Sequence, residues 1–438
     1  MHPKALVHHQ AGLAYQQKGN LQAAAEEYAR ALELDARLEL TRSYLATTLY
    51  QLGDYSGAIA QYQQLLGAEP DNIKHLYNLG VSCSAAGQWQ DAVALLLRCL
   101  KADTNFLPAL TSLSWLYQQQ GNVEGAITML GQIVRLDPED TNARYQLATL
   151  LRTAARLDEA VMQLGELLAY DPLHFAGRLL LATLFGSQTL WDAAWEQLVK
   201  IWTVEREFVG SRELGEQICQ AAIRQSAMAQ DARSEVVWLE RLCELRGRDA
   251  DLVRQLADLC RSIDRTAQAI ALYRELIELQ PHDPEAILAL AACLRRSGKR
   301  SEAQTVLLTL LKTHPQHARA LLALAELRLE TGNHDQALEL LGRAAISDPA
   351  LLEAQLLFAD IRMRQGQEAE AYRLLSGLLS QYPASGEVRQ AGGALCRHAA
   401  LACQGATEQT TWSGSLLLWW ERYLEFLPDD VKVLALLG

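Results

Sequence analysis

Hydrophobic residues in this 438-residue chain recur with helical spacing between short polar turns. Apolar residues fall three and four positions apart on either side of turns such as Gly19-Asn20 and Gly53-Asp54. This spacing predicts pairs of amphipathic helices joined by a tight turn. Because the same pair recurs every 34 residues, we expect one repeated unit stacked along the chain, and no single large core.

Two columns of the repeat are especially regular. An alanine occupies one position in all ten regular units, where a small side chain lets two helices approach closely: Ala24, Ala58, Ala92, Ala126, Ala160, Ala194, Ala269, Ala303, Ala337 and Ala371. Eight of the 11 prolines stand at the end of a unit, where proline ends a helix without loss of an internal hydrogen bond: Pro70, Pro138, Pro172, Pro281, Pro315, Pro349, Pro383 and Pro428.

This arrangement of small, aromatic and proline positions resembles the tetratricopeptide repeat. In the first unit, Ala5–Leu38, the matching residues are Gly12, Tyr15, Gly19, Ala24, Tyr28 and Ala31. The resemblance implies an all-α fold, a right-handed α-solenoid (superhelix) of about twelve stacked helix-turn-helix repeats. It also implies that the first helix of each pair lines a concave groove that holds peptides or protein segments.

The period divides the chain into five stretches. We expect a first array of six regular repeats over residues 5–208, an irregular elongated repeat over 209–249, a second array of four regular repeats over 250–385, another irregular elongated repeat over 386–430, and the start of a truncated further repeat over 431–438. The irregular stretches align as Trp238-Leu239-Glu240-Arg241 against Trp419-Trp420-Glu421-Arg422. Since solenoids normally end in a polar capping helix, the stop inside a repeat predicts either a trimmed chain or a natural protein that continues.

Charge and motif content narrow the possible functions. The chain has 40 Lys and Arg residues against 52 Asp and Glu residues, a net charge of −12, so no nucleic-acid partner is expected. No apolar run reaches the roughly 18 residues of a membrane span, and no signal peptide is evident, so we expect a cytoplasmic protein without a membrane span. The eight cysteines lack metal or disulfide spacing, and common catalytic motifs are absent. We therefore expect no enzyme activity, cofactor or metal.

The resemblance places groove-facing residues at repeat positions 2, 5, 6, 9, 12 and 13, counted from the first residue of each unit. In the first array these positions are rich in amides and aromatic side chains, and the candidate binding residues are Tyr44, Tyr77, Asn78, Trp115, Gln118, Tyr145 and Arg152. Amides can pair with a peptide backbone, and Tyr and Trp suit binding hot spots. The alternative is that the amides simply solvate a helix face, although an exposed Trp115 favours binding.

The second array is charged at the same positions. The candidate binding residues are four arginines in two neighbouring units, Arg254, Arg261, Arg295 and Arg296, and the next two units carry Glu326, Glu330, Glu353 and Asp360. Stacked arginines could hold a carboxylate or an acidic segment in bidentate fashion. The alternative is that they pair internally with Asp251, Asp258 and Glu285.

Three hypotheses follow. The leading one is a non-enzymatic protein-protein interaction scaffold that binds a partner peptide or protein segment in the groove. The second is the substrate-recruiting arm of a larger enzyme, for example a glycosyltransferase, whose catalytic domain lies beyond residue 438. The third is self-association, a possible homo-oligomer, through an apolar C-terminal surface made by Trp412, Trp419, Trp420, Tyr423 and Phe426.

Overall fold

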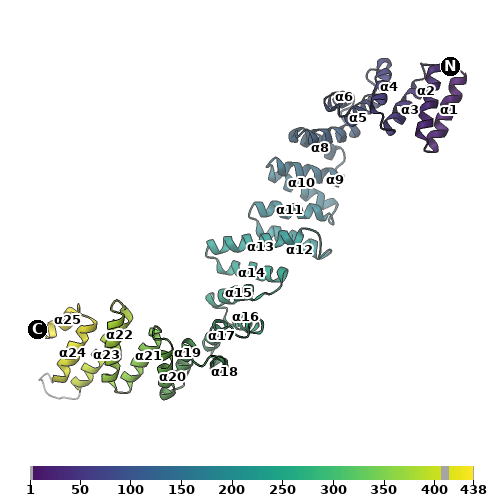
Figure 1. The fold of residues 1–438 in the computed structure, drawn as a ribbon. Helices are drawn as coiled ribbons and strands as arrows, with labels where there is room; N and C mark the ends of the chain where they lie inside the picture. The colour runs from purple at the N-terminus through teal and green to yellow at the C-terminus, as the bar shows by residue number, and fades with distance from the viewer. Residues whose placement is uncertain (1–2, 406–413, 438) are drawn as a thin grey trace. The chain divides into compact units, whose positions relative to one another are not determined.

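The computed structural model describes residues 3–405 and 414–437, and its chain forms two compact units, Met1–Ile218 and Cys219–Gly438. Figure 1 shows the helices of each unit stacked in chain order. The helices of the first unit are α1 (Pro3–Gln17), α2 (Leu21–Leu34), α3 (Glu39–Gln51), α4 (Tyr55–Ala68), α5 (Ile73–Ala85), α6 (Trp89–Ala102), α7 (Leu107–Gln119), α8 (Val123–Leu136), α9 (Thr141–Thr153), α10 (Leu157–Tyr170), α11 (Phe175–Ser187) and α12 (Trp191–Trp202).

The boundary between the units falls inside α13 (Ser211–Met228). The helices of the second unit are α14 (Ala232–Arg246), α15 (Ala250–Ser262), α16 (Thr266–Leu279), α17 (Pro284–Arg296), α18 (Arg300–Thr313), α19 (Ala318–Glu330), α20 (His334–Ser347), α21 (Leu352–Arg364), α22 (Glu368–Gln381), α23 (Gly386–Gly405), α24 (Gly414–Phe426) and α25 (Val431–Leu437). Among the described residues all regular structure is helical, which confirms the predicted all-α solenoid of helix-turn-helix repeats.

The first helices of neighbouring repeats lie closer together than the second helices. In the first unit α3 contacts α5, α5 contacts α7 and α9 contacts α11, while in the second unit α17 contacts α19 and α21 contacts α23. No comparable contact joins consecutive second helices in the part of the chain that the structure describes. Within each unit the first helices therefore form an inner face, and the second helices form an outer face with gaps between them.

Small residues recur at the contact between the two helices of each pair. The ten alanines of the repeat column are all at most 1% exposed. On the partner helix, repeat position 8 is also small, and a Cβ atom added to Gly12 would lie 2.5 Å from Cε1 of Tyr28. Tyr28 of the second helix, at 0% exposure, therefore packs its ring directly against Gly12 of the first helix, where a larger residue would clash.

The turn inside each pair requires a left-handed backbone conformation. Glycine supplies it in seven regular repeats, for example at Gly121 with φ 71°. Three regular repeats instead place Ala155, Thr189 and Asp264 there, with φ between 58° and 62°. This conformation costs an L-residue roughly 1–2 kcal/mol, and a β-branched side chain is the least suited to it.

We expect Thr189→Gly to raise the free energy of unfolding by about 0.5–1 kcal/mol, because relief of backbone strain exceeds the added entropy of the unfolded chain. Gly121→Ala, the matched reverse change at the same repeat position, should lower it. Urea denaturation followed by circular dichroism measures both. A lower midpoint for Thr189→Gly would show that the threonine side chain stabilises the turn.

The loop that joins one repeat to the next is tied by a recurrent hydrogen bond to its carbonyl groups. In one arrangement a donor at repeat position 4 of the following first helix reaches back six residues. Arg42 donates to Ala36, Arg144 to Pro138, Arg178 to Pro172, Gln355 to Pro349 and Arg389 to Pro383, over 2.7–3.0 Å. Unpaired carbonyl groups at these loops are thus avoided.

Other repeats reach the equivalent carbonyl from the second helix. Arg98 donates to Pro70, Gln132 to Thr104 and Arg343 to Pro315, over 2.6–3.0 Å, all from repeat position 26. These three repeats have a leucine at position 4. Where position 4 holds arginine, position 26 can instead be an acceptor: Arg42 donates to Gln64, and Arg144 donates to Glu166. The donor to the loop carbonyl group thus stands at position 4 in some repeats and at position 26 in others.

Arg144 is the most buried of these donors, at 4% exposure. Arg144→Ala should lower the free energy of unfolding by about 2 kcal/mol, since it leaves the Pro138 carbonyl group and Glu166 without this donor. The control is Arg135→Ala, which removes an exposed guanidinium bonded to the Gly131 carbonyl of its own helix, and it should change stability by no more than about 0.5 kcal/mol. If both variants lower the free energy of unfolding equally in chemical denaturation, the hydrogen bond from Arg144 to the loop does not stabilise the repeat.

The two stretched repeats share a cation–π contact. Helices α13 and α23 have 18 and 20 residues, whereas regular first helices such as α3 have 13. In the second helix of each, an arginine lies over the tryptophan three residues before it: Arg241 over Trp238 at 4.2 Å, and Arg422 over Trp419 at 4.8 Å. The sequence alignment of these two stretches therefore has a counterpart in three dimensions.

Two of the five residues expected to form an apolar surface near the C-terminus, Tyr423 and Phe426, are buried. Phe426 is 0% exposed and Tyr423 is 7% exposed, because both pack in a core cluster of α21 to α25. Trp419 and Trp420 are half-buried against the same cluster. Trp412 lies outside the described residues. These rings therefore belong to the internal core. Leu418, Val431 and Leu434 nearby are 42–75% exposed, and self-association through this region stays a prediction.

Candidate functional site

A groove of about 760 Å³ lies on the inner face of the second unit. It crosses α15, α17 and α19 and reaches the start of α21. The residues from these first helices stand at repeat positions 2, 3, 5, 6, 9 and 12, which include most of the expected groove-facing positions. Its floor is formed by small and apolar side chains, Leu288, Ala289, Ala292, Leu322 and Ala323. The helical period thus places these residues on one surface.

A buried tyrosine extends from the second helix of its pair to this groove. Tyr273, on α16, is 1% exposed, and its hydroxyl donates to Oδ1 of Asp258 over 2.6 Å. Burial raises the pKa of Tyr273, and the hydrogen bond to the Asp258 carboxylate raises it further. The hydroxyl therefore stays protonated and fixes the Asp258 side chain at the groove wall.

Arg254 and Arg261 line the groove, and both are engaged in ion pairs. Nη1 of Arg254 lies 2.7 Å from Oδ2 of Asp283, and its Nη2 donates to Gln280 over 2.9 Å. Nη2 of Arg261 lies 3.3 Å from Oδ1 of Asp258. Asp258 is thus shared by an arginine and a tyrosine hydroxyl.

Arg295 and Arg296 extend to neighbouring repeats. Arg295 forms an ion pair with Glu326 of α19, and its Nε lies 3.9 Å from Glu330. Arg296 reaches back to Asp264, at 2.6 Å, in the turn before α16. All four candidate arginines therefore have carboxylate partners within the second unit, as the alternative of internal pairing expects, although Asp258 is the single partner that the sequence named.

One carboxylate of the groove forms no ion pair with an arginine. Glu353, in the first turn of α21, is exposed, and no hydrogen bond or ion pair involves its side chain among the described residues. Glu285 is paired with Arg319 at 3.3 Å, and Glu326 with Arg295. The unsatisfied charge of the groove is thus negative.

The candidate residues of the first unit fall into two groups on its inner face. Trp115 is 50% exposed, and Gln118 on the same helix is exposed, as is Arg152 on α9. Tyr44, Tyr77, Asn78 and Tyr145 are half-buried. The first group can meet a ligand directly.

The half-buried group packs between helices. The ring of Tyr77 lies 5.5 Å from that of Phe106, and Tyr145 lies 5.3 Å from His174, where Phe106 and His174 are the N-caps of the next first helices. Tyr44 stacks on Tyr28 with ring centroids 5.8 Å apart. These tyrosines pack helices of the array against one another. The sequence pattern alone could not distinguish this structural role from ligand binding.

Asn78 has a comparable internal role. Burial raises the pKa of the Tyr62 hydroxyl, and side-chain hydrogen bonds with Thr47 and Asn78 partly offset that rise. Thr47 lies 2.9 Å from the same hydroxyl. The amide of Asn78 therefore helps to satisfy a buried tyrosine.

Trp115 and Tyr145 make a matched test of this division. Tyr145→Ala should lower the free energy of unfolding by about 2–3 kcal/mol, because it leaves a void beside the buried leucines of its cluster. Trp115→Ala should change it by less than about 0.5 kcal/mol, since the ring is half exposed. Thermal melts of the two variants check the difference. A large loss for Trp115→Ala would assign that ring to the core.

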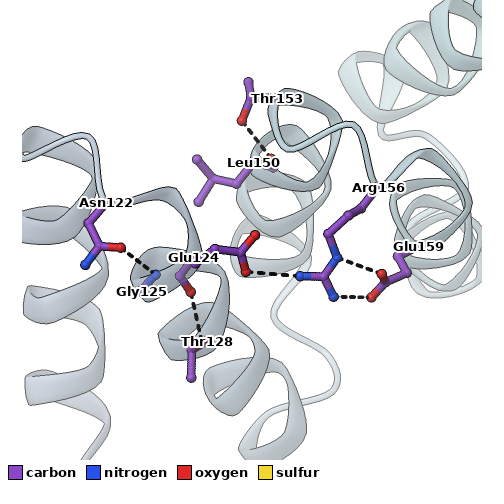
Figure 2. Close-up of polar contacts among 8 residues, drawn as sticks. All are labelled: Asn122, Glu124, Gly125, Thr128, Leu150, Thr153, Arg156 and Glu159. Carbon is purple, nitrogen blue, oxygen red and sulfur yellow. Dashed lines mark hydrogen bonds and ion pairs between the residues drawn. The ribbon is translucent and has the colours of Figure 1, made fainter.

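The outer face of the first unit has a depression that the sequence pattern did not indicate. It has a volume of about 650 Å³ and lies between α8 and α10 over α9. Arg156 lines this depression, and Figure 2 shows its guanidinium between Glu124 of α8 and Glu159 of α10. The guanidinium nitrogens lie 3.3 Å from Glu124 and 2.6 Å from Glu159. A Cβ atom added at Gly131 would meet nothing within 4 Å, so this glycine leaves space in the wall.

Charges in this depression are largely balanced. The hydrogen bond from Arg156 holds the pKa of Glu159 below its ordinary value, and Arg144 forms an ion pair with Glu166. A smaller depression of about 420 Å³ occupies equivalent positions between α18 and α20, beside Leu308 and Leu324. Both follow from the gaps between second helices.

Metal-ligand groups and cysteines were two further candidates for chemistry in the described residues. No group of three or more His, Cys, Asp or Glu side chains there could hold a metal ion. Seven cysteines are buried, and burial raises the pKa of Cys99 to about 11 and that of Cys396 to about 12, so these thiols remain protonated near neutral pH. None of the described helices combines the length and apolar character that crossing a membrane would need.

Stacked helix pairs with an open inner face define an all-helical repeat scaffold for protein interaction. Tetratricopeptide repeat models match residues 5–37, 45–105, 84–151, 117–184, 264–327, 309–351 and 328–395. These matches cover more than half of the chain. The chain belongs to the tetratricopeptide repeat family.

No curated protein matches the sequence. Among solved structures, the chain is similar to MamA, with 21% identity over 39% of this chain and 92% of that one, at a TM-score of 0.35. It is also similar to the C-terminal part of a TPR repeat-containing protein from Cytophaga hutchinsonii, with 15% identity over 56% and 98% of the chains, at 0.43. A third similar structure is Naa15/Naa10 bound to HypK-THB, with 14% identity over 98% and 79%, at 0.38.

Proposed function

We propose that the chain captures an extended segment of a partner protein in the inner groove of α15, α17 and α19. The observation that carries this proposal is the groove itself, about 760 Å³ with a floor of small apolar residues and walls of charged ones. Its volume lies within the range of established ligand sites, and a floor of alanines leaves room for side chains supplied by the ligand.

Internal ion pairs support this role because they hold the groove walls in one arrangement. Arg254 is fixed to Asp283, and Asp258 is fixed by both Arg261 and Tyr273. A ligand that binds to preorganised walls loses less conformational entropy on binding than one that must order flexible side chains. In this proposal the arginines Arg254 and Arg261 contact the ligand mainly through their stems, while Arg295 and Arg296 position neighbouring repeats.

The exposed residues of the first unit, Trp115, Gln118 and Arg152, are proposed as a second contact surface for the partner. A half-exposed tryptophan supplies large apolar contact area with a polar edge. We propose no catalytic role for the chain. The recruiting-arm hypothesis and the cytoplasmic location remain predictions.

A displayed library of random 12-residue peptides, selected on the full chain, tests the groove. We expect Ala292→Trp to weaken the selected peptides at least about tenfold, because an indole on the groove floor occupies the ligand's space. Ser301→Trp, which places the same side chain at an exposed site on α18, is the control and should leave binding unchanged. Circular dichroism verifies that both variants fold.

Two results would contradict the proposal. One is a selection that enriches no peptide above the background of the display system. The other is a set of peptides that bind Ala292→Trp as tightly as the original chain. Either would place ligand capture outside this groove.

A further inference from the structure

The charged groups of the groove do not cancel. Each arginine in the lining has a carboxylate partner: Arg254 has Asp283, Arg261 has Asp258, and Arg319 has Glu285. The lining carboxylate of Glu326 has Arg295. Glu353 remains without a counter-ion among the described residues, so the groove has one negative charge to offer to a ligand.

We infer that the groove selects a segment in which a large apolar side chain stands close to a lysine or arginine. The inference rests on the proposed function, because it assigns chemistry to the ligand of the same groove. The large side chain occupies the alanine floor, and the cation pairs with Glu353.

The alanine floor is local to the middle of the groove. At repeat position 9 the three stacked first helices carry Asp258, Ala292 and Glu326, so the middle helix is the small one. At position 6, Ala289 and Ala323 are again small. Leu288 and Leu322 border this low area, so an aromatic or long aliphatic side chain of the ligand would meet apolar groups beneath it and beside it.

Glu353 lies in the part of the groove next to α19. Leu351 and Glu353 bring the start of α21 into the lining, beside Leu322 and Glu326 of the preceding repeat. The charged groups close in the lining are Glu326, which Arg295 neutralises, and Arg319, which Glu285 neutralises. A ligand cation at Glu353 therefore displaces no existing partner, and the net charge of −12 favours the approach of a basic segment.

An acidic ligand fits this groove less well. To reach Arg254 or Arg261, a ligand carboxylate must compete with Asp283 or with Asp258. Breaking such a pair leaves a protein carboxylate without its counter-ion, so one contact is gained at the expense of another. From the sequence alone, these arginines suggest an acidic ligand. In the structure they are already paired with carboxylates, so an acidic ligand is disfavoured.

The peptide selection described above also tests this inference. Peptides that bind the full chain and lose affinity for Ala292→Trp should be enriched in a Lys or Arg within a few residues of Trp, Phe, Tyr or Leu. Glu353→Lys should weaken them at least about tenfold, through loss of the attraction and gain of a like charge. Glu339→Lys, which makes the same charge change at an exposed site on the outer helix α20, is the control and should alter affinity less than about twofold.

The outcomes separate the two proposals. If Ala292→Trp has no effect, the groove is not the binding site and the proposed function fails. If Ala292→Trp abolishes binding but the peptides are acidic, or Glu353→Lys binds them as well as the original chain, the groove is the site and only the basic-apolar ligand is wrong. Raising the salt concentration should weaken the enriched peptides for the original chain and have less effect on their residual binding to Glu353→Gln.

Discussion

The close approach of two helices at a column of alanines is the constraint on which the rest of this structure depends. The ten alanines are at most 1% exposed, and repeat position 8 on the partner helix is small as well, so the two helices of each pair pack closely in repeat after repeat. The stacking of identical pairs then brings first helices together and leaves second helices apart. The inner groove and the outer depressions are both consequences of that difference, and neither needs a dedicated structural element.

The regular part of the fold could be predicted from the sequence, because its determinants are local. Alanine at one repeat position allows two helices to pack closely, and proline at the unit end terminates a helix. Neither effect depends on the residues of neighbouring repeats. The positive-φ turns at Ala155, Thr189 and Asp264 show that the array imposes its geometry even where glycine is absent. Tyr423 and Phe426 were misjudged because composition alone does not tell whether a ring faces a core or a solvent-exposed end.

The candidate site was less predictable, for a different reason. A helical period tells which residues share a face, and the groove lining agrees with the expected positions. It does not tell which partner a charged side chain chooses. Arg296 pairs with Asp264, 32 residues earlier, and Arg295 pairs with Glu326, 31 residues later, so their pairing depends on how adjacent repeats stack. The same limit applies to Tyr77 and Tyr145, whose contacts at the next N-cap come from stacking.

The tie between loop and repeat has a consequence for how such an array can change in length. Whether the donor is Arg144 at repeat position 4 or Arg98 at position 26, it belongs to the repeat that follows the loop, and the acceptor is a main-chain carbonyl that any sequence provides. Each of these repeats therefore contains the side chain that donates to the loop before it. A whole repeat of this kind can be duplicated, deleted or exchanged without loss of the hydrogen bond at the new junction. The groove surface can therefore change while the contacts between successive repeats are kept.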